Sequence, residues 1–251
     1  MAAAKGAVMA EALLEVRGVT KRFGGFTALD GVDFLVRPGE RVGLIGPNGS
    51  GKSTLVNCIA GTLRNEEGSI RFEGEEIRGH AAHRRIRLGL ARSFQIPKPF
   101  ASMTVLDNLC VPLLYAARGH EKLAPGRIVE EAMRILGQVG LAGRARAMSG
   151  GLTQVDMRKL ELARAMAAKP KLLISDEAMA GLSASEVDDV LALLYGLKEQ
   201  GVAVIMIEHV MRAVMKFSER IAVLVAGRKI ADGDPQSVVG NAEVVRAYLG
   251  E

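Results

Sequence analysis

Nine consecutive residues of this chain have the composition and spacing of a phosphate-binding loop: Gly46-Pro47-Asn48-Gly49-Ser50-Gly51-Lys52-Ser53-Thr54. They fit the pattern G-x-x-x-x-G-K-[ST] at every fixed position. The glycines let the backbone pass close to an anion, so that backbone N–H groups and the N-terminus of the next helix face phosphate. Lys52 would then reach the β- and γ-phosphates, and the hydroxyl of Ser53 would be a ligand of Mg²⁺. The segment therefore predicts a nucleotide site.

Two carboxylates follow an apolar run further along the chain, in Lys171-Leu172-Leu173-Ile174-Ser175-Asp176-Glu177. If this run is a strand beside the phosphate loop, Asp176 lies at the sheet edge, where it can hold Mg²⁺ directly or through water. Glu177 could then activate the attacking water as a general base. Ser175 is polar in an otherwise apolar run, and an acidic helix start after a core strand is the alternative interpretation.

The elements that must position these residues alternate between strand and helix. A short apolar run, residues 41–45, precedes the loop, and residues 55–60 read as the first turns of a helix. After Pro170 the same alternation returns, with apolar runs at 172–174, 202–207 and 221–226 and a helix start at Ser183-Ala184-Ser185-Glu186. Strands that alternate with helices predict a mostly parallel sheet.

Shorter runs near the N-terminus, at residues 13–16, 32–36 and 69–74, read as strands, with turns expected at Gly24-Gly25 and Asp30-Gly31. They predict a small antiparallel sheet beside the core. A helical section begins at Thr104-Val105-Leu106-Asp107, which has the [ST]-x-x-[DE] form of a helix start, and Pro112 is expected to kink or break that helix.

Further helices are expected at about 125–136, 153–168 and 241–249. The predicted fold is an α/β P-loop NTPase (RecA-like) core, residues 12–97 and 166–251, with an N-terminal antiparallel β subdomain. A helical subdomain at about 98–165 is inserted into this core, and residues 1–11 form a flexible extension.

The charge balance gives little reason to expect a nucleic-acid partner. The net charge is +5, from 33 basic and 28 acidic residues, without a long basic block. The basic stretch at 83–87 is interpreted as a solvated helix face. Two cysteines, Cys58 and Cys110, do not make a disulfide framework and favour a reducing cytoplasm. No apolar run reaches the roughly 20 residues needed to cross a bilayer.

Taken together, these motifs resemble the ATP-binding subunit of an ABC transporter over essentially the whole chain. Ser93-Phe94-Gln95 is similar to the family's glutamine loop, which implies that Gln95 senses Mg²⁺ or water. Glu208-His209 is similar to its switch histidine, which implies a γ-phosphate contact for His209. Ala180-Gly181-Leu182-Ser183 takes the place of the loop that crosses the dimer interface, and Phe23 resembles the aromatic residue that stacks on adenine.

Within the family, three segments resemble subunits of importers for branched-chain amino acids and related small polar solutes: residues 91–95, 207–211 and 246–251. The resemblance implies an ATPase on the cytoplasmic face of the cell membrane, working with Mg²⁺ and ATP. It also implies two membrane permease subunits, a second ATPase subunit and a periplasmic solute-binding protein.

The sequence departs from the family at its signature, usually Leu-Ser-Gly-Gly-Gln at a helix N-terminus, which completes the ATP site of the opposite subunit. Spacing places the signature on Leu152-Thr153-Gln154-Val155-Asp156, which keeps a hydroxyl at Thr153 but has neither glycine. Met148-Ser149-Gly150-Gly151-Leu152 is closer in letters but lies four residues too early, about one helical turn. Ala178 also replaces the proline that commonly follows the catalytic glutamate.

These departures favour an asymmetric heterodimer, with a homodimer as the alternative. In the heterodimer, this chain's phosphate loop, Asp176, Glu177 and His209 would form the competent site with the partner's signature. A nucleotide-dependent switch with little hydrolysis of its own is the alternative function. An ABC-type DNA repair or translation protein is a third, which the mild basic excess and the single cassette disfavour.

Overall fold

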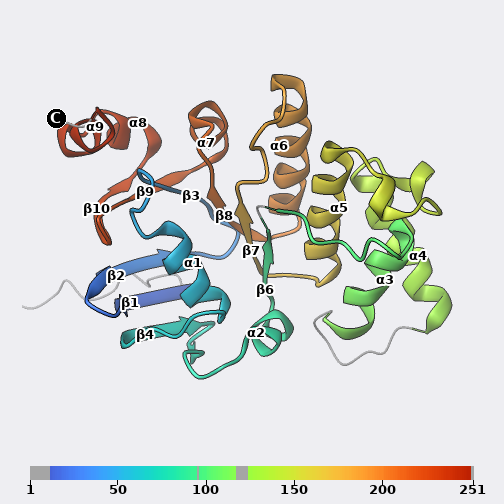
Figure 1. Cartoon of the computed structure of the whole chain (residues 1–251), viewed down its shortest axis with the longest axis horizontal. Coiled ribbons are helices and arrows are strands. Elements are labelled where there is room, and N and C mark those ends of the chain that lie inside the picture. Colours follow the sequence, from blue (N-terminus) through green and yellow to red (C-terminus); the bar gives the residue numbers. More distant parts are fainter. Residues whose placement is uncertain (1–11, 95, 117–123, 250–251) are drawn as a thin grey trace, which may run out of the picture.

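A six-stranded sheet forms the middle of the molecule (Figure 1). The computed structural model describes residues 12–94, 96–116 and 124–249. The strand order is β10-β9-β3-β8-β7-β6, and every neighbouring pair is parallel except β10 with β9. The bounds are β3 Arg41–Ile45, β6 Leu90–Ser93, β7 Leu172–Asp176, β8 Ala203–Ile207, β9 Arg220–Val225 and β10 Arg228–Gly233. The parallel strands therefore end at one edge, where the phosphate loop and Asp176 also lie.

The side chains of these strands alternate between two hydrophobic cores. In β3, Val42 and Leu44 belong to one core and Ile45 to the other; in β7, Leu172 and Ile174 lie on the first side and Leu173 on the second. This follows from the two-residue period of a strand. Because both of their faces are covered, the inner strands β3, β7, β8 and β9 read as apolar runs, and the sequence predicts all four. The edge strands β6 and β10 contain charged residues and are not predicted.

An antiparallel sheet and helix α1 (Lys52–Ala60) cover one face of the central sheet (Figure 1). The sheet has the order β2-β1-β4-β5, formed by β1 Leu14–Phe23, β2 Phe26–Val36, β4 Glu67–Phe72 and β5 Glu75–Glu76. The predicted antiparallel sheet and the turn at Gly24-Gly25 are confirmed.

The predicted turn at Asp30-Gly31 is wrong, because β2 runs through it without a break. The register of β1 against β2 shifts between Val19 and Lys21, and Gly31 has a φ of +63°. The N–H of Gly31 donates to Oγ1 of Thr20 at 3.1 Å. Gly31 therefore lies at a bulge in a long strand. Its positive φ, which glycine also allows in a turn, is used here inside the strand.

In its described residues, the helical segment at one end of the long axis has three helices and two short 3₁₀ turns (Figure 1). They are α3 Val105–Tyr115, α4 Pro125–Gln138, α5 Gln154–Ala167, η1 Ala142–Arg144 and η2 Ser149–Gly151. The capping box predicted at Thr104 is confirmed, since its hydroxyl accepts from the N–H of Asp107 and the Asp107 carboxylate accepts from Thr104.

Pro112 is expected to kink or break this helix; the break is wrong, because α3 continues to Tyr115. The ring removes one backbone hydrogen bond, but the N–H of Ala116 still donates to the carbonyl of Pro112 at 2.8 Å. Leu109 and Leu113 are buried on either side of the proline. Their packing against the rest of the segment outweighs the local preference of proline.

The remaining helices are α2 Ala82–Leu88, α6 Ala184–Glu199, α7 Met211–Phe217, α8 Pro235–Val239 and α9 Ala242–Leu249. The interpretation of 83–87 as a solvated face is wrong for Arg85, which is 2% exposed. Its guanidinium donates to the carbonyls of Cys58 at 2.6 Å and Ile59 at 2.8 Å, at the C-terminal end of α1. A cation here satisfies carbonyls that a helix end leaves unpaired and complements the helix dipole.

In the part of the chain that the structure describes, no helix has the length and apolarity to span a membrane.

Candidate nucleotide site at the carboxyl edge of the parallel sheet

The phosphate loop joins the end of β3 to the start of α1 and needs glycine at two of its positions. Gly46 has a φ of +152°, and a Cβ there would lie 2.1 Å from the carbonyl oxygen of Leu224. Gly51 has a φ of +104°, and its Cβ would lie 2.7 Å from the carbonyl oxygen of Ala28. Any side chain at these two positions would push the loop away from the strands that support it.

Lys52 is the first residue of α1, and its ammonium group points back into the loop. Nζ donates to the carbonyls of Gly46 at 2.7 Å and Pro47 at 3.0 Å. Burial lowers the pKa of Lys52, while the negative charges of Glu177 and Asp176 oppose that shift. The two carboxylates predicted from a distant part of the sequence therefore lie close enough to act on Lys52. Ser53 is exposed beside it, in the first turn of α1.

Asp176 is buried at the carboxyl end of β7, and an arginine that the sequence analysis gave no role reaches it. Nη2 of Arg92, on β6, donates to Oδ2 of Asp176 at 2.5 Å. Nη1 of the same guanidinium donates to Oδ1 of Asn57, on α1, at 2.6 Å. The guanidinium of Arg92 therefore joins the carboxylate at the end of β7 to the helix after the phosphate loop.

Glu177 leaves the sheet with a φ of +48°, a conformation that costs a non-glycine residue free energy and recurs at functional sites. Its N–H donates to the carbonyl of Ile207 at 2.8 Å, which fixes the turn against the end of β8. Oε1 of Glu177 lies 3.1 Å from Nε2 of His209. The structure thus brings together the two residues that the sequence assigned to the base and the switch histidine.

Two further side chains support this turn from neighbouring elements. Arg158, on α5, donates to the carbonyls of Glu177 and Ala180, each at 2.9 Å. Glu208 is 3% exposed and accepts a hydrogen bond from the N–H of Met179 at 2.8 Å. Burial, with a smaller contribution from the charge of Glu177, raises the pKa of Glu208 to about 7. The loop after Glu177 is therefore held on both sides.

The remaining predicted site residues have different positions. Phe23 ends β1 on the antiparallel sheet, is 48% exposed, and lies with its ring centroid 5.1 Å from Nζ of Lys21. Gln95 lies outside the described residues.

The candidate Mg²⁺ ligands that can be described, the hydroxyl of Ser53 and the carboxylate of Asp176, both offer oxygen. Mg²⁺ prefers oxygen from one or two carboxylates together with substrate phosphates, so this donor set fits it.

The two possible signature segments differ in what their hydroxyls do. Ser149 is fully buried in η2, where its Oγ donates to the carbonyl of Phe100 at 2.9 Å and accepts from Nδ2 of Asn108. Thr153 is the exposed N-cap of α5, and its Oγ1 accepts from the N–H of Asp156 at 3.2 Å. Only Thr153 offers a hydroxyl at an exposed helix N-terminus, which favours the placement by spacing.

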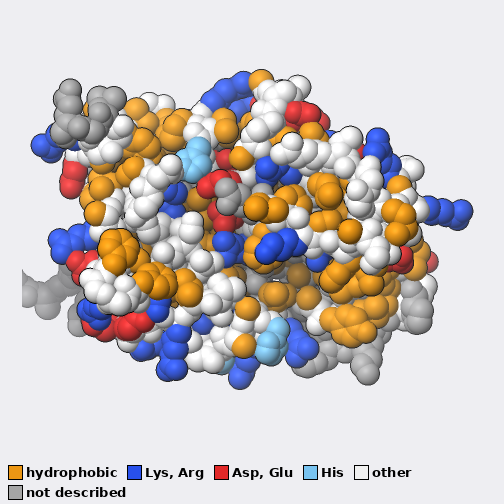
Figure 2. All heavy atoms as spheres, in the orientation of Figure 1, with side chains coloured by type: hydrophobic (Ala, Val, Ile, Leu, Met, Phe, Trp, Pro, Cys, Tyr) orange, Lys and Arg blue, Asp and Glu red, His pale blue; other side chains and the backbone are white. Residues whose placement is uncertain are grey.

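Charged side chains of both signs, with a histidine, gather near the middle of the face in Figure 2, and hydrophobic side chains spread to the right, where Figure 1 places the helical segment.

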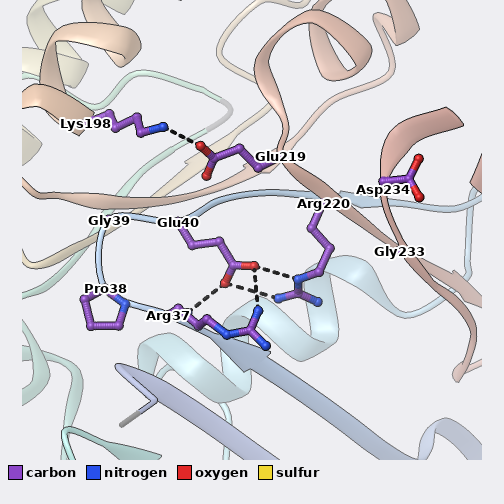
Figure 3. Close-up of a pocket in the computed structure, with 9 residues that line it drawn as sticks. All are labelled: Arg37, Pro38, Gly39, Glu40, Lys198, Glu219, Arg220, Gly233 and Asp234. Atoms are coloured by element: carbon purple, nitrogen blue, oxygen red, sulfur yellow. Dashed lines mark hydrogen bonds and ion pairs between the residues drawn. The ribbon is translucent and has the colours of Figure 1, made fainter. Parts of the chain in front are cut away.

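The hollow in Figure 3 lies elsewhere, lined by the loop before β3, the end of α6, the start of β9 and the end of β10. All of its cations are paired with acids of the lining: Arg220 with Glu40 at 2.7 Å, Arg37 with Glu40, and Lys198 with Glu219. It therefore offers a poor site for a phosphate.

The sequence analysis assigned no role to three residues that shape the site. One of them could have been noticed: Arg92 stands among the small and apolar residues Leu90, Ala91 and Ser93, and a charged residue in such a stretch is unusual if the stretch is a buried strand. Glu208 carried a weaker signal, as an acid directly after the apolar strand β8. Arg158 sits on a helix among other charged residues, and nothing in its spacing distinguishes it.

Comparisons with known proteins give a consistent result. The profile of the ABC transporter family matches residues 29–180, and that of the branched-chain amino acid ATP-binding cassette transporter matches residues 228–251. The high-affinity branched-chain amino acid transport ATP-binding protein BraF of Pseudomonas aeruginosa is 40% identical, over 97% of this chain and 100% of its own length. The high-affinity branched-chain amino acid transport ATP-binding protein LivG of Escherichia coli K12 is 34% identical, over 97% of this chain and 100% of its own length. The solved ADP conformation of MJ1267, an ATP-binding cassette of an ABC transporter, has a TM-score of 0.86 at 32% identity, over 96% of this chain and 99% of that one.

Proposed function

This chain belongs to the ATP-binding cassettes of the ABC transporter family, and we propose that it is the ATP-hydrolysing subunit of an importer for branched-chain amino acids or a related small polar solute. The solute class rests on the similarity to BraF and LivG, which are branched-chain amino acid transport proteins, and on the profile matched by residues 228–251. The chain would act on the cytoplasmic face of the cell membrane, with a periplasmic protein delivering the solute.

Each site residue then has a proposed role. The phosphate loop, including Lys52, would bind the phosphates of ATP, and Phe23 would stack on adenine through its exposed face. Ser53 and Asp176, with Gln95, would hold Mg²⁺, which when bound neutralises charge on the phosphates. Glu177 would take a proton from the attacking water as general base.

The observation that carries this proposal is the contact between Glu177 and His209, 3.1 Å apart at the sheet edge that holds the phosphate loop. A hydrogen bond from the imidazole orients the carboxylate, and the strained backbone of Glu177 points its side chain out of the sheet. A general base must be aimed at its water in this way before its pKa matters.

The test is Glu177→Gln in the complete transporter. The amide keeps the shape and cannot accept the proton, so we expect ATP binding to stay near wild type and hydrolysis to fall by about 10² or more. The control is Glu199→Gln, which changes an exposed acid at the end of α6. Unchanged turnover in Glu177→Gln would remove Glu177 from the base role.

The membrane subunits would bind at the junction of the core and the helical segment, next to the end of β6. Exposed hydrophobic side chains lie before and at the start of the helical segment, at Phe94, Ile96, Phe100 and Met103. The exposed Met148 joins them, because a backbone bridge pairs it with Thr104. Larger exposed apolar surfaces of this kind mark interaction sites. The position would let the permease act on the residues that bind Mg²⁺.

We propose that the second ATPase subunit is a different cassette, because α5 of this chain begins poorly for binding phosphate. Gln154 and Val155 put side chains where the family has glycine, and Asp156 adds a carboxylate to the first turn. A negative charge there opposes a second anion at the helix N-terminus. Arg144 pairs with Asp156 at 3.1 Å and offsets part of that charge. The site built on this signature would therefore hydrolyse ATP slowly.

The same degenerate signature supports the alternative function, a nucleotide-dependent switch with little hydrolysis. The two functions differ in one measurement, single-turnover hydrolysis in the assembled complex. A transport ATPase cleaves the ATP bound by Lys52 and its loop in that assay, whereas a switch binds ATP and releases it intact.

A further inference from the structure

Arg92 is a charged side chain inside the central sheet that the proposed roles do not use. It is the third residue of the edge strand β6, between the buried residues Ala91 and Ser93, and its side chain is only 13% exposed. β6 pairs in parallel with β7, with Arg92 opposite Ile174, two residues before Asp176. Arginine is rarely buried unless it is paired, so its partners indicate why it is there.

The two terminal nitrogens of Arg92 each have one oxygen partner. Nη2 bonds to Oδ2 of Asp176 at 2.5 Å, and Nη1 bonds to Oδ1 of Asn57 at 2.6 Å. Among the described residues, Nε has no hydrogen-bond partner. The guanidinium is therefore held by the carboxylate that would serve Mg²⁺ and by the helix that follows the phosphate loop.

We propose that Arg92 is a positioning residue that orients Asp176 and competes with Mg²⁺ for its negative charge. Two cations on one carboxylate repel each other, and burial of both side chains weakens the screening of that repulsion by solvent. Arg92 thus sets how strongly nucleotide binding depends on Mg²⁺.

The guanidinium keeps partners when Asp176 turns toward a metal ion. Its bond to Asn57 does not involve Asp176. Its Cζ also lies 5.4 Å from the ring centroid of Phe94, within the range in which an aromatic face stabilises a cation. Releasing Asp176 therefore does not leave an isolated buried charge, which makes the exchange energetically accessible.

Removing the charge of Arg92 has opposite effects with and without metal. Without Mg²⁺, the unpaired Asp176 repels the phosphates, so the nucleotide binds more weakly. With Mg²⁺, the same carboxylate is free to bind the metal, so the complex binds as well or better. The ratio of the Kd in EDTA to the Kd in Mg²⁺, here called the magnesium factor, therefore rises.

The test measures this factor by equilibrium binding of an N-methylanthraniloyl derivative of ATP to the full chain. In Arg92→Gln we expect it to rise at least about fivefold, the lower end of typical coupling between two binding events. Arg134→Gln, which removes an arginine paired with Glu131 on α4, is the matched control and should leave it unchanged. In an Asp176→Asn background, Arg92→Gln should also leave it unchanged, because the shared carboxylate is gone.

The inference rests on the proposed nucleotide site, and the outcomes separate the two. A wild-type chain that binds no analogue in either buffer overturns the proposed function. A wild-type chain that binds, with the same magnesium factor in Arg92→Gln, overturns this inference alone. If thermal melting shows that Arg92→Gln is unfolded, the variant Asn57→Asp replaces it. A carboxylate at position 57 would draw the guanidinium of Arg92 away from Asp176. If the magnesium factor does not rise in Asn57→Asp, the inference is also overturned.

Discussion

Glu208 makes the stability of this chain depend on pH. Its carboxyl is buried beside the turn of Glu177, and burial raises its pKa from 4.5 to about 7. Below pH 4.5 it is protonated in the folded and the unfolded chain alike, so it has no effect. As the pH rises toward 7, the unfolded chain releases the proton first, and stability falls. At 1.36 kcal/mol per pH unit, the loss reaches about 3 kcal/mol by pH 8.

The variant Glu208→Gln isolates this effect, because the amide oxygen can still accept from the N–H of Met179 but the side chain cannot ionise. We expect the free energy of unfolding in urea to exceed that of the wild type by up to about 3 kcal/mol at pH 8. At pH 5 the difference should shrink to less than about 1 kcal/mol. The exposed Glu199→Gln is the matched control and should change neither value.

Two results would refute the reasoning about Glu208. One is a difference between variant and wild type that is the same at pH 5 and pH 8, since titration would then contribute nothing. The other is a variant that is less stable at pH 8, which would mean that the ionised carboxylate is stabilised by its bond to Met179 more than burial penalises it.

Two other substitutions test the signature and the support of α1. The double substitution Gln154→Gly with Val155→Gly should raise the ATPase turnover of the assembled complex, because it lets the backbone of α5 approach phosphate; unchanged turnover argues against a weak second site. Arg85→Met should lower the free energy of unfolding by about 2 to 4 kcal/mol, because it leaves the carbonyls of Cys58 and Ile59 buried without a donor. Arg87→Met, exposed on the same helix, should change it by less than about 0.5 kcal/mol, and equal losses would contradict the capping role.

The sequence predicts the parts of the site that are local in the chain. The glycines, Lys52 and Ser53 lie within nine residues, and Asp176 and Glu177 lie at the end of one strand and directly after it, so short patterns suffice. The contacts between these parts are not local. The bond from Arg92 to Asp176 spans 84 positions, and that from Met179 to Glu208 spans 29. Such pairs depend on which strands become neighbours in the sheet, and no pattern within one segment encodes that order.

The errors in the predicted fold have a common physical cause. A turn at Gly31, a break at Pro112 and a solvated Arg85 are each what the local sequence favours. In each case a tertiary contact contributes more free energy than the local preference and determines the structure. These contacts are the pairing of β1 with β2, the burial of α3, and the hydrogen bonds to the carbonyls at the end of α1. Local preferences amount to about 1 kcal/mol for glycine and about 3 for proline, which one buried side chain or a few hydrogen bonds can offset.

Helix α5 connects the two halves of the proposed ATPase dimer. Its first turn, at Thr153, carries the signature offered to the partner's nucleotide in the proposed arrangement, and Arg158 lies five residues further along. At 1.5 Å per residue these positions are about 8 Å apart on one rigid element. Arg158 donates to the carbonyl of Glu177, so a shift of α5 along its axis changes both the turn that aims the base and the contact with the partner. In the proposed dimer, weak binding at the signature would therefore not be isolated from the proposed competent site, because α5 carries both Thr153 and Arg158.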